Sequence, residues 1–163
     1  MDLLDRLLEH DADTTRELLL LARDLPDDDL DREFDLALRS VRATLEHIVR
    51  NMEAWTDLMR EVPVRPVEGE RGSIAGLLAR VDSAAADLAA LAREVRARDG
   101  WDETWIDHLD DPPREKTFGG AIAHVITHSM HHRGQVVHFL KKLGVECVPE
   151  GDVLGWERRR SPD

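Results

Sequence analysis

The chain has 163 residues and a mass of 18.5 kDa, which is the size of one domain, so we expect a single domain over residues 1–163. Hydrophobic residues make up 42% and charged residues 34%, which excludes a disordered tail. No apolar run approaches the roughly 20 residues of a membrane-spanning helix. The short apolar runs lead us to expect no membrane among the partners. The formal net charge of −12 repels phosphate backbones, so we also expect no nucleic acid.

The first predicted helix covers residues 2–23. Pro26 ends it, and we expect the acidic run at residues 27–29 to be a solvated loop. The helical prediction rests on leucines that recur on one face of a helix, namely Leu3, Leu4, Leu7, Leu8, Leu18 and Leu21.

The second predicted helix covers residues 36–61. Pro63 and Pro66 close it, and a loop with Gly69 and Gly72 follows. Its apolar residues recur at steps of three and four, as expected for a buried helical face: Leu38, Val41, Leu45, Ile48, Met52, Trp55 and Met59.

The third predicted helix begins after Ser73, a suitable N-cap, and continues to about residue 98, before Gly100. Residues 101–117 are expected to be irregular, with their tryptophans packed on the helices or on a partner chain. The fourth predicted helix covers residues 118–143 and ends at a glycine.

These elements predict an all-α fold. Tyrosine is absent and alternation of β-branched residues is hard to find, so strands have little support. Four helices of roughly 20–26 residues with modest connections are typical of a four-helix bundle. The irregular segment lies between the third and fourth helices.

Two further features concern the cellular compartment. Asp2, Asp5 and Glu9 interrupt the basic and apolar opening that a signal peptide would have, so we expect a cytoplasmic protein. Cys147 is the single cysteine, which excludes an internal disulfide. We expect it to be a small buried residue, the alternative being a free thiol near the end of the bundle.

Histidines carry the strongest chemical signal. Five of the eight lie between His124 and His138. His128 and His132 are four residues apart, which places both imidazoles on one helical face within reach of one metal ion. His124 and His128 share this spacing, so spacing alone leaves two candidate pairs.

The helical wheel favours the pair of His128 and His132. At about 100° per residue, His132 lies roughly 50° and His128 roughly 90° from the centre of the apolar face. His124 lies roughly 130° away, and His131 and His138 point further toward water. Metal sites in bundles use side chains that project inward, and the inner pair meets this requirement.

A third ligand has to come from another helix. His47 is the best candidate, His10 is its competitor, and His108 in the irregular segment is less suited. The residues alone leave this choice open. They also leave open a metal-free bundle with incidental histidines. The pair lacks the glutamate of an HExxH motif, which argues against a zincin protease.

Three segments carry a resemblance to a known family. They are the run of residues 128–135 that ends in HRGQ, the segment TLEHIV at residues 44–49 with Trp55 after it, and GDVLGW at residues 151–156. In these, the chain resembles the DinB family of metalloenzymes. The resemblance implies a four-helix bundle with up-down-down-up connectivity, often a homodimer. It also implies a divalent metal, commonly zinc or nickel, held by His47, His128 and His132.

The resemblance also suggests a chemistry, since some relatives use low-molecular-weight thiols as cofactors. Three neutral imidazoles leave a metal with its full charge and an open position, which activates a water or a thiol. We therefore expect a metal-dependent thiol transferase or hydrolase with a small-molecule substrate. The alternative is a non-catalytic metal-binding bundle with a structural or small-molecule-binding role.

Three residues beside the histidine pair have expected roles. Gln135 is a candidate for orienting a ligand or the bound water from behind the metal ligands. Arg133 is expected to pair with a carboxylate inside the bundle. Gly134 is expected to allow a neighbouring helix to approach closely.

Overall fold

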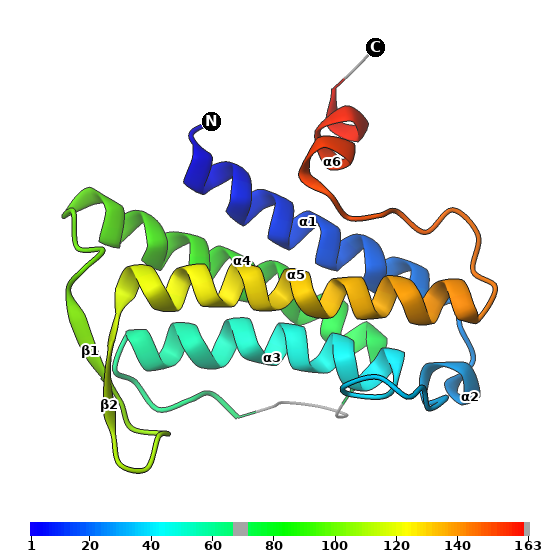
Figure 1. Cartoon of the computed structure of the whole chain (residues 1–163), viewed down its shortest axis with the longest axis horizontal. Coiled ribbons are helices and arrows are strands. Elements are labelled where there is room, and N and C mark those ends of the chain that lie inside the picture. The colour runs from blue at the N-terminus through cyan, green and yellow to red at the C-terminus, as the bar shows by residue number, and fades with distance from the viewer. Residues whose placement is uncertain (67–71, 162–163) are drawn as a thin grey trace.

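The computed structural model describes residues 1–66 and 72–161, so Gly69 lies outside the described residues, and the fold is mostly helical (Figure 1). None of the helices in the described ranges is long and apolar enough to cross a membrane. The four long predicted helices are confirmed as α1 (Leu3–Arg23), α3 (Val41–Met59), α4 (Ile74–Ala97) and α5 (Phe118–Lys142). Two short helices and a small sheet accompany them: α2 (Asp27–Leu30), β1 (Thr104–Asp107), β2 (Arg114–Thr117) and α6 (Val153–Arg160).

Each long helix begins where a side chain caps its free backbone amides. Ser73, the predicted cap of α4, accepts a hydrogen bond from the amide of Gly76 at 3.0 Å. Asp2, Ser40 and Thr117 do the same for α1, α3 and α5. Because the first four amides of a helix lack partners within it, such a cap contributes about 1 kcal/mol.

The start of α3 differs from the prediction, which placed it at residue 36. Ala37 and Arg39 have φ angles of 44° and 73°, in the left-handed region. This backbone cannot continue a right-handed helix, so α3 begins only after Ser40.

The acidic run after α1 is helical, and its prediction as a loop was wrong. Asp27–Leu30 form α2, in which the amide of Leu30 donates to the carbonyl of Pro26 at 3.0 Å. Three aspartates in the first turn suit the positive end of a helix. Leu30 is buried in the common core, which supplies the tertiary contact that a four-residue helix needs.

The prediction that residues 101–117 are irregular was also wrong, because they form a hairpin. β1 and β2 pair antiparallel, from Thr104 opposite Thr117 onward. Four-residue strands are too short for alternation to be visible in the sequence. Trp105 is buried and packs edge to face on Trp55 of α3, with ring centroids 6.0 Å apart, so this segment is packed on the helices.

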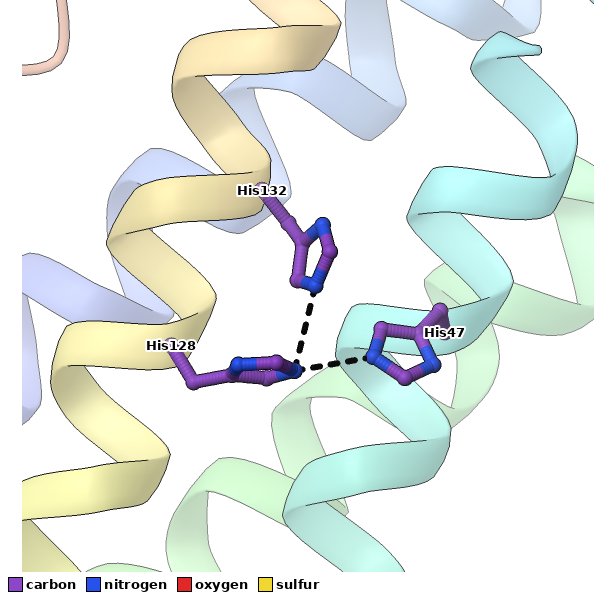
Figure 2. A group of neighbouring side chains, drawn as sticks. All are labelled: His47, His128 and His132. Atoms are coloured by element: carbon purple, nitrogen blue, oxygen red, sulfur yellow. Dashed lines mark hydrogen bonds between the residues drawn. The ribbon is translucent and has the colours of Figure 1, made fainter. Parts of the chain in front are cut away.

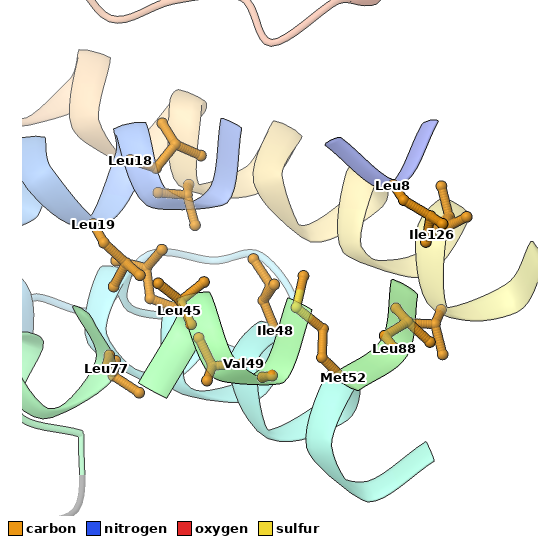
Figure 3. Packing of buried hydrophobic residues seen from close by; sticks show 14 of the residues in the cluster. Leu8, Leu18, Leu19, Leu45, Ile48, Val49, Met52, Leu77, Leu88 and Ile126 are labelled. Atoms are coloured by element: carbon orange, nitrogen blue, oxygen red, sulfur yellow. The ribbon is translucent and has the colours of Figure 1, made fainter. Parts of the chain in front are cut away.

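The core lies between the four long helices. α3 packs against α4 and α5, and α1 packs against the same two helices. Figure 3 shows buried leucine, isoleucine, valine and methionine side chains from these helices in one cluster. The hairpin lies at one end of the long helices and α2 at the other (Figure 1).

The chain after α5 returns to α1. Trp156 of α6 is buried, and its indole Nε1 donates to Asp13 of α1 at 3.0 Å. Cys147, in the connection between α5 and α6, is exposed, so its prediction as a buried residue was wrong. Its φ angle of 56° belongs to an irregular turn outside the helical core.

Candidate metal centre

Two neighbouring helices bring three histidines together. His128 and His132 extend from α5, and His47 extends toward them from α3 (Figure 2). The Nε2 atom of His128 lies 2.9 Å from Nε2 of His47 and 3.1 Å from Nε2 of His132. One nitrogen of each ring lies within 4.8 Å of the others. The three residues expected from the resemblance therefore form one cluster.

The positions of these residues follow from local helix geometry and from the packing of α3 on α5. Residues four apart on α5 lie one above the other, so His128 and His132 present their rings to the same neighbour. His132 is buried, while His128 and His47 are half-buried. The cluster thus lies at the edge of the core.

Burial keeps two of these rings neutral. The pKa of His47 is lowered mainly by burial and further by the charge of His132. Burial is also the main cause that lowers the pKa of His128 to about 4, and the charged neighbours that add to this shift are all histidines. A neutral imidazole has a free lone pair, so these rings can bind a cation at neutral pH without first losing a proton.

The second nitrogen of His132 is held by Gln135. The His132 Nδ1 donates a hydrogen bond to the Gln135 Oε1 at 2.8 Å, and both side chains are buried. This partner leaves the His132 Nε2 directed at the other two rings, as Figure 2 shows. Gln135 therefore lies behind a candidate metal ligand, and its expected role in orienting a ligand or a bound water stays a prediction.

The remaining candidate histidines lie outside the cluster. His10 is buried under α6, with its Nε2 2.7 Å from the carbonyl oxygen of Gly151. His108 is exposed in the hairpin turn. The ring of His124 stacks on that of His128, with centroids 5.0 Å apart, but its nitrogens do not belong to the group.

Aromatic and cationic side chains flank the cluster on the hairpin side. Trp55 contacts His124, with ring centroids 4.9 Å apart, and Nζ of Lys116 lies 4.8 Å from the centroid of Trp55. No local pattern in the sequence identifies Lys116, because its position depends on the pairing of β2 with β1. These side chains make one wall beside the candidate site.

Arg133 pairs with a buried carboxylate, as expected, and the partner is Asp11 of α1. Asp11 was not among the predicted residues, although its position in the sequence contains a signal. Asp11 lies on the helical face that contains Leu8, Thr15 and Leu18, where a charged side chain has to find a partner.

The prediction for Gly134 was wrong. The residue is exposed, and a Cβ atom added to it would meet nothing within 4 Å. Gly134 lies on the outer side of α5, away from the neighbouring long helices, so no close helix approach depends on it.

The cluster fits a divalent metal ion. Two imidazole nitrogens bound to a tetrahedral zinc ion at about 2.0–2.1 Å would lie roughly 3.3 Å apart, close to the separations of 2.9 and 3.1 Å. Within residues 1–66 and 72–161, no cysteine, aspartate, glutamate or fourth histidine joins the group. Three neutral nitrogen ligands leave at least one coordination position for a ligand from solution.

Comparison with known proteins identifies the family of the chain. No protein of curated function matches the chain. The family model described as the DinB family matches residues 1–158, nearly the whole sequence. The chain therefore belongs to the DinB family.

Proposed function

We propose that the protein is a metal-dependent enzyme with His47, His128 and His132 as the ligands of one divalent ion, zinc or nickel. The observation that carries this proposal is the convergence of three imidazole nitrogens without a fourth protein ligand in the part of the chain that the structure describes. A structural zinc site is normally closed by four protein ligands, whereas a catalytic site retains an open position.

The chemistry requires a ligand at that open position. A divalent ion held by His47, His128 and His132 would lower the pKa of a bound water or thiol and so would supply a nucleophile at neutral pH. The protein residues fix the geometry: α5 sets the spacing of His128 and His132, and Gln135 orients His132. We propose a thiol transferase or a hydrolase with a small-molecule substrate, with a low-molecular-weight thiol as the cofactor in the first case.

Cobalt substitution tests the metal site. The purified protein is loaded with Co²⁺, and its visible absorption is followed while azide or a thiol such as cysteine is added. A spectrum that changes with added ligand supports an exchangeable position. A spectrum that azide and thiols leave unchanged contradicts the enzyme proposal and favours a non-catalytic metal-binding bundle.

Two variants on one helix provide the control. His132→Ala should abolish stoichiometric metal binding, measured by elemental analysis, because two ligands remain. His138→Ala should keep the metal, because this exposed residue lies outside the cluster. Wild-type protein that binds neither zinc nor nickel would refute the three-histidine site.

The proposal has further parts that follow from the sequence and the family resemblance. They are one domain over residues 1–163, up-down-down-up order of the long helices, a homodimer and a cytoplasmic location. Light scattering coupled to size-exclusion chromatography tests the dimer, and a mass near 18.5 kDa would exclude it.

A further inference from the structure

A chain of hydrogen bonds connects the cluster to the protein surface. The Gln135 Nε2 lies 2.9 Å from the His131 Nε2, and the Gln135 Oε1 accepts from the His132 Nδ1 at 2.8 Å. Gln135 is only 6% exposed, whereas His131 lies at the surface of α5. One buried amide therefore joins a surface imidazole to a candidate metal ligand.

The polarity of this chain is determined by the amide. An amide nitrogen only donates hydrogen bonds, so the His131 Nε2 has to be the acceptor. An amide oxygen only accepts, so the His132 Nδ1 has to carry the proton. A neutral His132 then has a free lone pair on Nε2, the atom that faces His128.

The reversed amide would have the opposite effect on His132. With its nitrogen toward His132, Gln135 would donate to Nδ1, and the proton of the neutral ring would move to Nε2. A protonated Nε2 cannot bind a metal ion. The orientation of the Gln135 amide therefore decides whether His132 is ready to act as a ligand.

We infer that His131 is a positioning residue of the metal centre. Its Nε2 accepts the hydrogen bond from the Gln135 amide and thereby keeps the amide oxygen toward His132. This inference rests on the proposed metal site, and it adds a residue that has no contact with the metal. His131 is one of the histidines that the helical wheel placed toward water, and the inference gives it a role.

Substitutions with opposite hydrogen-bonding capacity test the inference. In His131→Asp, the carboxylate can only accept, so it should retain the amide orientation and zinc affinity. In His131→Lys, the ammonium can only donate, so it should compete for the Gln135 oxygen and favour the reversed amide. Loss of a group that orients a metal ligand typically costs roughly 10–100-fold in affinity, and we expect a loss in this range for the lysine variant.

The charges of these substitutions need a control of their own. Thr127 is exposed one turn before His131, and its hydroxyl donates to the carbonyl of Ala123 within the same helix. Thr127→Asp and Thr127→Lys place the same charges near the site without reaching Gln135. The ratio of zinc dissociation constants between the lysine and aspartate variants should therefore be much larger at position 131 than at position 127.

The Gln135→Ala background isolates the role of the amide. Without the amide, the lysine-to-aspartate ratio at position 131 should fall to the value measured at position 127. Competition with a chromogenic chelator measures the zinc dissociation constants. ¹⁵N NMR of the imidazole nitrogens in zinc-loaded wild type should show His131 with its proton on Nδ1 and His132 with Nε2 bound to the metal.

The outcomes separate this inference from the proposed function. If wild-type protein binds zinc and positions 131 and 127 give the same ratio, the positioning role of His131 is refuted while the metal site stands. The role is equally refuted if the ratio at position 131 persists in Gln135→Ala, or if the His131 proton resides on Nε2. If wild-type protein binds no divalent metal, the proposed function fails and this inference fails with it.

Discussion

The ion pair between Arg133 and Asp11 ties α5 to α1, and its removal should be one of the most damaging single changes in the protein. Arg133 is 3% exposed and Asp11 is 2% exposed, so neither charge has water to replace a lost partner. The Nη1 atom of Arg133, which donates to the Asp11 carboxylate, also donates to the hydroxyl of Thr15 at 3.2 Å. Removal of one member of a buried pair costs about 3–5 kcal/mol, because the other charge stays buried without compensation.

Arg133→Met should therefore lower the free energy of unfolding by about 3–5 kcal/mol. For a protein of this size, each kcal/mol shifts Tm by about 2–4 °C, so the expected decrease is roughly 6–20 °C. Urea denaturation followed by circular dichroism measures the free energy, and the same signal on heating gives Tm. A loss below about 1 kcal/mol would refute the view that Asp11 depends on this partner.

The double variant Asp11→Leu with Arg133→Met refines the prediction. The Nε and Nη2 atoms of Arg133 are buried without hydrogen-bond partners, so the pair is incompletely satisfied. Replacement of an entire buried pair by apolar residues is often neutral or stabilising. We expect the double variant to recover most of the stability that either single variant loses. If the two losses simply add, the side chains do not act as a pair.

The same pair gives the stability of the protein a defined pH dependence. Burial raises the pKa of Asp11 from 3.8 to about 6, although Arg133 opposes this shift. Since the pKa is higher in the folded protein than in the unfolded chain, the folded state favours the protonated acid. This contribution to stability is complete below pH 3.8 and is lost as the pH rises through about 6. In the double variant, this loss between these pH values should be absent.

Further predictions concern packing, capping and exposure. Leu45→Ala should lower the free energy of unfolding by about 2–5 kcal/mol, because this side chain is 0% exposed. Leu154→Ala should change it little, because Leu154 is 69% exposed. Similar losses for both variants would contradict the described core. Ser73→Ala should lower the free energy of unfolding by about 1 kcal/mol, measured by urea denaturation, because it removes the cap of α4. An unchanged free energy of unfolding would argue against this capping role. Cys147 should react with a maleimide in the folded protein as fast as in 6 M urea, and protection in the folded state would contradict its exposure.

Local patterns in the sequence account for most of the helices and for two of the three histidines of the candidate site. Helix periodicity, proline and cap residues act within a few neighbouring positions, so they predicted four long helices and the Ser73 cap. The same periodicity selected His128 and His132, because their relation depends only on the geometry of one helix. It failed where the pattern was too short, at α2 and in the hairpin, because contacts distant in the sequence stabilise these elements.

The choice of the third histidine shows where local reasoning ends. Periodicity did not separate His47 from His10, since this choice depends on which helix lies opposite the inner face of α5. The resemblance pointed to His47, and the packing of α3 on α5 brings its ring to that of His128. His10 instead contacts the carbonyl of Gly151, in a segment that follows it by more than a hundred residues.

The sequence by itself determined the helical class, the long helices and the spacing that puts His128 and His132 on one face. Only the tertiary structure decided how Asp11 meets Arg133, how β2 brings Lys116 to Trp55, and that Gln135 is buried. The physical reason is that hydrogen bonding and side-chain periodicity within a helix are local properties of the chain. Burial, which lowers the pKa of His128 and raises that of Asp11, exists only once the helices have packed together.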